Sequence, residues 1–189
     1  LASTGAKQTI YNLFMAVVDP GDEVVIPAPY WVSYPDMALL ADGVPVMPYA
    51  GPEQGYKITA KQLEAAITAK TRVFMLNCPD LYDRTVTING VSKSYAMTGW
   101  RIGYCGGPVE IVTAMSTIQS QCTSNPSSIS QKAATAALNG DQACVGEMNK
   151  HFKARHDYFN AGLNALPGFK VLPAAGTFYA WCDVTEAIH

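Results

Sequence analysis

Charged residues are scarce in this chain, and long apolar runs are missing. Asp, Glu, Lys and Arg make up only 15% of the 189 residues, and the formal net charge is -2. Nucleic-acid-binding domains carry basic stripes, and the sequence has none, so we expect no nucleic-acid partner. A membrane-spanning helix needs about 18 or more consecutive apolar residues, and no run reaches that length. With 49% hydrophobic residues, the composition predicts a globular cytoplasmic protein without a membrane segment.

The cysteines lack the pattern of a disulfide framework or a zinc site. Their number is odd, and they form no Cys-x-x-Cys pair; they are Cys78, Cys105, Cys122, Cys144 and Cys182. Disulfide frameworks use paired cysteines, and structural zinc sites use closely spaced pairs. We therefore expect these cysteines to be small buried residues, and we expect no metal site.

Hydrophobic periodicity predicts helices that alternate with strands. Ile10, Leu13 and Phe14 have helical spacing, and Thr59 with Gln62 has the spacing of a capping box. Helices are predicted at residues 6–18, 31–41, 59–67, 108–120, 128–139 and 142–166. Strands are predicted at residues 23–27, 44–48, 72–77, 85–89, 101–105, 170–172 and 177–182. This alternation predicts an α/β fold with a mixed, mostly parallel sheet flanked by helices.

Lys93 and Arg101 form the most informative pair of residues. Lys93 follows the β-branched run at residues 85–88, and Arg101 comes eight residues later in a glycine-flanked turn. A lysine amine forms Schiff bases with aldehydes, and the planar guanidinium of arginine pairs with phosphate. Together they suit pyridoxal phosphate, provided that burial or a cationic neighbour favours the neutral lysine. Taken alone, the pair is a weak motif that surface charges beside a turn would also explain.

Two other positions allow both a functional and a purely structural interpretation. Gly5, Ala6 and Lys7 open a predicted helix, whose free N–H groups and positive dipole end favour a phosphate. A plain glycine turn before an amphipathic helix fits the same residues. The large flat indole of Trp31 suits stacking on an aromatic ligand, but a tryptophan in the hydrophobic core is the more common case.

Several sequence blocks, taken in order, point to one family. The block around Lys93 covers residues 89–104, and the others cover residues 4–8, 20–24, 28–35, 124–126 and 176–179. These blocks resemble the fold-type-I, class I/II aminotransferases, specifically the bacterial aspartate aminotransferase branch. They extend from the first residues nearly to the last, so coincidence explains them poorly. The resemblance implies the large domain of an enzyme that depends on pyridoxal 5'-phosphate.

The resemblance also implies a role for each candidate site residue. Lys93 would be the catalytic amine, and the cofactor would be bound by Gly5, Ala6, Lys7, Trp31, Ser92, Lys93, Arg101, Ser124 and Asn125. Ser124 and Asn125 would approach the cofactor from the second subunit of a homodimer, although Ser-Asn-Pro is also an ordinary helix start. The implied reaction moves an amino group between an amino acid, aspartate, and a 2-oxo acid, 2-oxoglutarate.

The linker between two predicted strands is unexpectedly short. Seven residues separate the strand at 72–77 from the strand at 85–89, whereas a parallel crossover needs about a dozen or more. Either the strands are antiparallel or chain is absent near residues 78–81. The resemblance favours absence, because relatives carry here an Asn-Pro turn and an Asp-x-x-Tyr strand whose side chains contact the cofactor ring.

Other segments are expected to be missing as well. Leu1 opens directly into motif-like sequence, without a signal peptide, and the chain resembles the middle of a protein. We expect N-terminal and C-terminal segments to be absent, residues 1–165 to form the cofactor-binding large-domain core, and residues 166–189 to begin a small C-terminal domain. The alternative to an aminotransferase is a catalytically silent fragment or scaffold that keeps the fold and a weak phosphate site.

Overall fold

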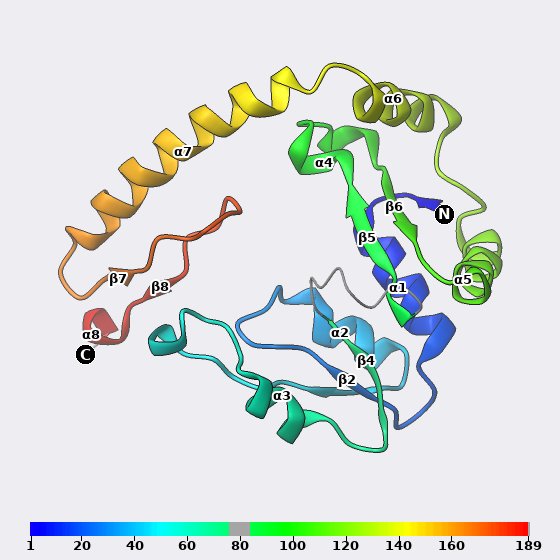
Figure 1. Ribbon diagram of the computed structural model, residues 1–189, viewed down its shortest axis with the longest axis horizontal. Helices are drawn as coiled ribbons and strands as arrows, with labels where there is room; N and C mark the ends of the chain where they lie inside the picture. Colours follow the sequence, from blue (N-terminus) through cyan, green and yellow to red (C-terminus); the bar gives the residue numbers. More distant parts are fainter. Residues whose placement is uncertain (76–83, 189) are drawn as a thin grey trace. The chain divides into compact units, whose positions relative to one another are not determined.

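The computed structural model describes residues 1–75 and 84–188. Contacts divide the chain into two compact units, Leu1–Gly140 and Asp141–His189 (Figure 1). This boundary lies before the one predicted at residue 165, because helix α7 (Ala143–Asn164) is fastened to the strand that follows it. The predicted division into a large and a small domain refers to the domains of the whole family fold, not to contacts within this chain, and it stays a prediction.

The first unit contains a parallel sheet of three strands. Strand β2 (Glu23–Val25) lies between β3 (Val44–Val46) and β4 (Thr71–Phe74) and is parallel to both. Val24 and Val25 are fully buried. A parallel strand is covered on both faces, so its sequence is apolar without alternation. The predicted strands at residues 23–27, 44–48 and 72–77 are thus present; the first two end two residues earlier than predicted, and β4 begins one residue earlier.

A second sheet of the same unit is antiparallel. Strand β6 (Gly103–Gly106) lies between β1 (Ala2–Ser3) and β5 (Thr87–Gly90). The α/β prediction with mixed strand directions is therefore confirmed. Strands β4 and β5 belong to different sheets and share no ladder among the described residues, so they are not antiparallel neighbours. The predicted gap near residues 78–81 lies outside the described residues.

Helices cover these sheets. The longer ones are α1 (Ala6–Val17), α2 (Ser33–Leu40), α3 (Ala60–Ala66), α5 (Val109–Cys122) and α6 (Ser128–Asn139). The described part of the unit also contains three short elements, namely α4 (Val91–Ser94) and the 3-10 turns η1 (Pro52–Gln54) and η3 (Thr98–Trp100). The predicted capping box is present, since the Thr59 side chain accepts from the Gln62 N–H.

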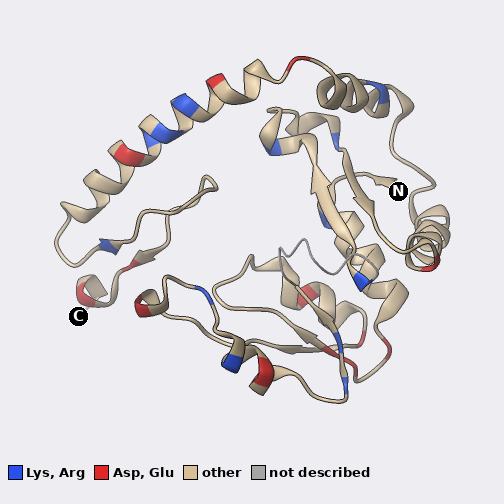
Figure 2. Ribbon diagram, viewed as in Figure 1, with Lys and Arg blue, Asp and Glu red and all other residues tan. Residues whose placement is uncertain are grey.

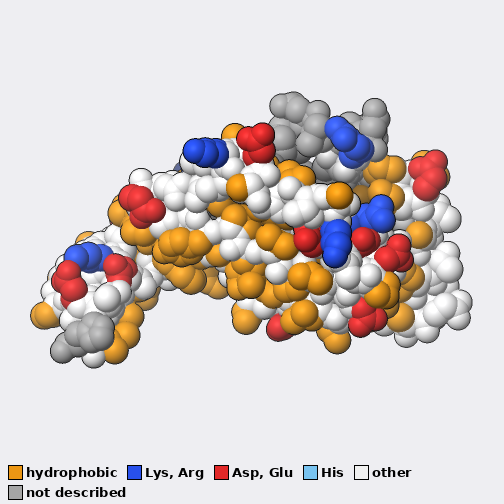
Figure 3. All heavy atoms as spheres, turned by 90° about the horizontal axis from the view of Figure 1, so that it is seen from below, with side chains coloured by type: hydrophobic (Ala, Val, Ile, Leu, Met, Phe, Trp, Pro, Cys, Tyr) orange, Lys and Arg blue, Asp and Glu red, His pale blue; other side chains and the backbone are white. Residues whose placement is uncertain are grey.

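One hydrophobic core joins α1 to the parallel sheet. Ile10 and Phe14 pack with Val24 and Ile26, and Phe14 has no exposed surface. Other hydrophobic side chains reach the surface, as orange areas in Figure 3 show on one face. In the first unit, Val32 is 71% exposed and Leu40 is 67% exposed. The apolar pattern of α1 therefore builds the core, whereas that of α2 is only partly used within this chain.

Two backbones meet closely at the start of α1. A Cβ atom added to Gly103 in β6 would lie 2.2 Å from the Ala6 nitrogen and 2.4 Å from the Gly5 carbonyl carbon. Gly103 also pairs with Ser3 on one side and with Gly90 on the other. Strand β6 thus holds the ends of β1 and β5 beside the first turn of α1, and only glycine fits there.

The second unit consists of α7, the antiparallel strands β7 (Lys170–Val171) and β8 (Cys182–Asp183), and α8 (Thr185–Ile188). The Asn164 side chain donates to the Val171 carbonyl and accepts from its N–H. Charges of both signs lie along α7, as Figure 2 shows, and include the pair Lys150–Glu147. The strand predicted at 177–182 was wrong over most of its length, because it begins only at Cys182 and Thr177 has a φ of 74°.

The cysteine prediction was only partly right. Cys105 in β6 is buried, and burial raises the pKa of its thiol, so it stays protonated near neutral pH. Cys122 and Cys144 are exposed at helix ends, Cys182 is half-buried, and Cys78 lies outside the described residues. Within residues 1–75 and 84–188, no helix is long and apolar enough to cross a membrane.

The close approach at Gly103 predicts a large effect of a single methyl group. Gly103→Ala should lower the free energy of unfolding by roughly 1–3 kcal/mol, because the added Cβ meets backbone atoms that cannot move aside independently. Gly106→Ala in the same strand is the matched control, since its Cβ would meet nothing within 4 Å. Urea denaturation of both variants measures the difference, and equal stability of the two would contradict the assigned contact.

Candidate functional site

One cavity of the first unit brings together most of the predicted site residues. Its volume is about 1020 Å³. The α1 start, the segment before α2, the β5 end with α4, and the residue after η3 all contribute to it. The predicted site residues that line it are Gly5, Ala6, Lys7, Trp31, Ser92, Lys93 and Arg101. Residues far apart in the sequence thus share one wall, as the Lys93 motif and the helix-start motif together predict.

The first turn of α1 presents N–H groups at this cavity. The N–H groups of Gln8 and Thr9 both donate to the Gly5 carbonyl, at 3.0 and 3.3 Å. The N–H groups of Ala6 and Lys7 precede these first intrahelical bonds and have no partner within the helix. The first turn contains no acidic residue, so its positive dipole end is not neutralised from within. This geometry suits an anion.

Arg101 lies directly against this helix start. A Cβ atom on Gly5 would be 2.7 Å from Arg101 Nη2, and Gly5 has a φ of 109°. The guanidinium is held from behind, because Nη1 donates to the Thr98 carbonyl at 2.8 Å. Arg101 itself has a left-handed backbone, with a φ of 54°. The glycine leaves the space in which the guanidinium lies, so Gly5 and Arg101 act together.

Lys93 lies in α4, which begins at Val91 directly after the end of β5, and it lines the cavity. The pairing of Gly90 with Gly103 fixes this end of β5 beside the start of α1. Lys93 is exposed, so burial does not desolvate its amine. The other described cations that line the cavity are Lys7 and Arg101.

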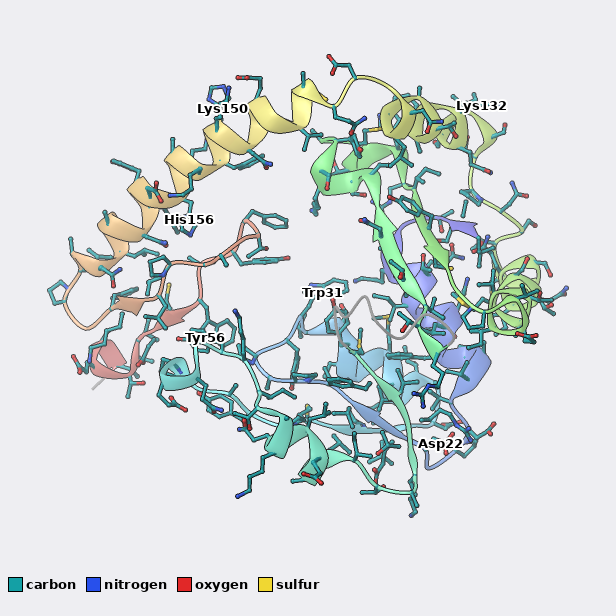
Figure 4. All side chains as sticks on the ribbon, viewed as in Figure 1. Asp22, Trp31, Tyr56, Lys132, Lys150 and His156 are labelled. Carbon is teal, nitrogen blue, oxygen red and sulfur yellow. The ribbon has the colours of Figure 1, made fainter. Side chains whose placement is uncertain are left out.

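Trp31 combines both interpretations of the sequence. It packs against the hydrophobic core and also lines the cavity, where Figure 4 labels it. Lys7 Nζ lies 4.5 Å from the centre of the indole ring, a cation–π distance. Tyr34 contacts the ring edge-on, with 5.4 Å between ring centres. The indole is thus held in a fixed orientation in the cavity wall.

The charge of the cavity has one sign. Lys7, Lys93 and Arg101 line it, and none of its described lining residues is Asp or Glu. Its other polar side chains are hydroxyls and one amide, which include Ser92, Ser94, Thr98 and Asn89. Such a wall attracts anions such as phosphate and carboxylate, and Lys93 adds a primary amine.

Ser124 and Asn125 lie elsewhere. They are exposed after the end of α5 and are not among the described residues that line this cavity. Ser124 has a left-handed backbone with a φ of 60°, and the Asn125 side chain donates to the Pro126 carbonyl. The structure therefore does not bring these two residues to the site that the same chain forms.

The sequence analysis missed two residues that shape the site. Gly103 appeared in the Lys93 block, but nothing local showed that its hydrogen atom faces the Gly5–Ala6 backbone. Gln8 was also missed. Its side-chain oxygen accepts from the Thr4 N–H at 2.7 Å and so fixes the residue before Gly5. A glutamine in the first turn of a helix gives no sequence signal of such a contact.

Comparison with known proteins identifies the family. The family described as "Aminotransferase class I and II" matches residues 1–81 and 80–187. The aspartate/prephenate aminotransferase of Nitrosomonas europaea is 46% identical over 240 aligned positions, which cover 100% of this chain and 60% of that protein. The alignment is longer than the 189-residue chain, so it includes positions at which only the relative has residues. An aspartate aminotransferase of Rhizobium meliloti is 41% identical over 231 aligned positions, which cover 95% of this chain and 56% of that protein.

Solved structures agree with the sequence relatives. The crystal structure of the aspartate aminotransferase from Rhizobium meliloti superposes with a TM-score of 0.93 at 38% identity, over 98% of this chain and 60% of that one. The aspartate aminotransferase from Thermus thermophilus with maleate gives a TM-score of 0.92 at 32% identity, over 98% and 61%. The chain thus spans about 60% of the length of the proteins it matches, and it belongs to the class I and II aminotransferase family.

Proposed function

We propose that this chain forms the cofactor-binding core of a pyridoxal-phosphate-dependent aminotransferase. The observation that carries the proposal is the cavity in which the Lys93 amine, the Arg101 guanidinium and the α1 start share one wall without a described carboxylate. Class I and II aminotransferases in general use this cofactor. When bound, it supplies an aldehyde that bonds to an amine and a ring that withdraws electrons.

The residues present fit that cofactor. The free N–H groups of Ala6 and Lys7, together with the Arg101 guanidinium, would hold its phosphate, and Ser92 offers a hydroxyl nearby. Trp31 would present its indole to the cofactor ring. Lys93 Nζ would hold the aldehyde carbon and, once an amino acid has displaced it, would carry the proton removed from the Cα of that amino acid.

The substrates of the proposed reaction are an amino acid and a 2-oxo acid. We propose aspartate and 2-oxoglutarate, because the relatives are named aspartate or aspartate/prephenate aminotransferases. The Thermus thermophilus relative was crystallised with maleate, a dicarboxylate. The cationic wall suits substrates of that charge, and their water solubility agrees with a cytoplasmic enzyme.

We further propose a homodimer and a chain segment that is missing from this sequence. Ser124 and Asn125 are exposed away from the cavity of their own chain, which agrees with a role in the site of a second subunit. The missing segment would lie near residues 78–81. It is supported by the two family matches that meet at residues 80–81 and by an alignment longer than the chain.

The absence of a carboxylate from the described cavity wall favours a second candidate function. A carboxylate beside the pyridine nitrogen would keep it protonated and so preserve its electron-withdrawing power. Without one, the chain would be a catalytically silent scaffold that keeps the fold and a weak phosphate site. Incubation with pyridoxal phosphate, aspartate and 2-oxoglutarate separates the two candidates: oxaloacetate formed faster than by Lys93→Ala supports the aminotransferase, and equal rates support the silent scaffold.

Replacing Lys93 should abolish covalent attachment of the cofactor. After incubation with pyridoxal phosphate and reduction with borohydride, the wild-type chain should gain one phosphopyridoxyl group on the peptide that contains Lys93. Lys93→Ala should lose it, because no other amine replaces that position at the end of β5. Lys132→Ala on α6, labelled in Figure 4, is the matched control, since Lys132 does not line the cavity. An unchanged yield of adduct in Lys93→Ala would refute the assignment.

Replacing Arg101 should weaken binding of the phosphate group specifically. Arg101 is exposed, so we expect Arg101→Ala to cost up to about 1 kcal/mol, or about fivefold in the Kd for pyridoxal phosphate. Binding of pyridoxal, which lacks the phosphate, should not change. Titration followed by absorbance measures both values, with Arg155→Ala in the second unit as the control. An equal loss for both ligands would show that Arg101 acts on the fold and not on the phosphate.

A further inference from the structure

Two polar contacts join α1 to α5 along one face of each helix. Gln8 and Asn12 lie four residues apart on α1, and they face Thr123 and Gln119 near the end of α5. Gln8 Nε2 donates to Thr123 Oγ1 at 2.6 Å, and Asn12 Nδ2 donates to Gln119 Oε1 at 3.1 Å. Asn12 and Gln119 are buried, with 0% and 3% exposed, whereas Gln8 is half-buried.

Both contacts extend to the segment that leads into the α1 start. Gln119 Nε2 donates to the Ala2 carbonyl at 2.7 Å. Gln8 Oε1 accepts from both the Thr4 N–H, at 2.7 Å, and the Thr4 hydroxyl, at 2.6 Å. Because Thr4 precedes Gly5, these bonds fix the backbone that presents the N–H groups of the first turn. One side chain, Gln8, thus bonds Thr4 with one end and Thr123 with the other.

Thr123, which accepts from Gln8, is the residue directly before the Ser124–Asn125 turn. The Thr123 N–H donates to the Gln119 carbonyl, and the Asn125 N–H donates back to the Thr123 carbonyl at 2.8 Å. Ser124, between them, has the left-handed φ of 60°. Fully buried Pro126 follows, so the turn is fixed on both sides. Asn125 is thus bonded to the backbone of Thr123, whose side chain accepts from Gln8.

We propose that Gln8 is a positioning residue that couples the anion-binding start of α1 to the Ser124–Asn125 turn. The roles of these two sites rest on the proposed function. The α1 start would hold the phosphate in its own subunit, and the Ser124–Asn125 turn would contribute to the site of the partner subunit. The coupling itself depends only on the Thr4–Gln8–Thr123 bonds. It gives the two sites of a dimer a physical connection that is built from one side chain.

Amide hydrogen exchange of the 189-residue chain, followed by NMR, tests the coupling without any ligand. Thr123→Val removes the hydroxyl that holds Gln8 Nε2, and exchange at the Thr4 N–H should become about fivefold faster. Thr123→Ser keeps the hydroxyl and should restore the wild-type rate. Thr117→Val is the matched control, because the Thr117 hydroxyl bonds only to Thr113 of the same helix. Unchanged Thr4 exchange in Thr123→Val, or an equal change in Thr117→Val, would overturn the proposal.

A second measurement separates this coupling from the proposed function. Pyridoxal phosphate added to the wild-type chain and to Thr123→Ser should slow exchange at the Asn125 N–H, but the same addition to Thr123→Val should not, since coupling between two sites is reciprocal. If the ligand binds and Asn125 responds equally in all three proteins, the coupling is refuted. If Thr4 responds to Thr123→Val but the chain binds no pyridoxal phosphate, the coupling stands and the proposed function fails.

Discussion

The site depends on the backbone contact between Gly103 and the Gly5–Ala6 peptide. Gly103 pairs with the last residue of β1 and the last residue of β5, so three segments distant in sequence end at one point. The same contact places Arg101, two residues earlier, against Gly5. Lys93, three residues beyond Gly90, then lines the same cavity. A side chain at position 103 would separate these segments, and the anion-binding wall would be lost with them.

The sequence predicts the local features of this arrangement and misses the long-range ones. Helix α1 and the Thr59 capping box follow from spacing over a few residues, and Lys93 and Arg101 are recognisable because the chemistry requires an amine and a guanidinium. The roles of Gly103 and Gln8 come from contacts across the fold, which periodicity does not contain. Residues 177–181 are rich in aromatic side chains, as strands often are, but only Cys182 and Asp183 pair with β7.

The groups that bind the cofactor differ from those that its turnover requires. Cations and helix N–H groups hold an anion by electrostatic attraction, and Lys7, Arg101 and the α1 start supply these within the described chain. Turnover also needs a carboxylate that keeps the ring nitrogen protonated, and no described lining residue provides one.

A crystal structure of this chain grown with pyridoxal phosphate tests the central claim most directly. The predicted result is a phosphate between the Ala6 and Lys7 N–H groups and the Arg101 guanidinium, with the aldehyde carbon bonded to Lys93 Nζ and the ring beside Trp31. A cofactor bound outside this cavity, or a bond to a lysine other than Lys93, would contradict the claim that Gly103, Gly5 and Arg101 form its binding site.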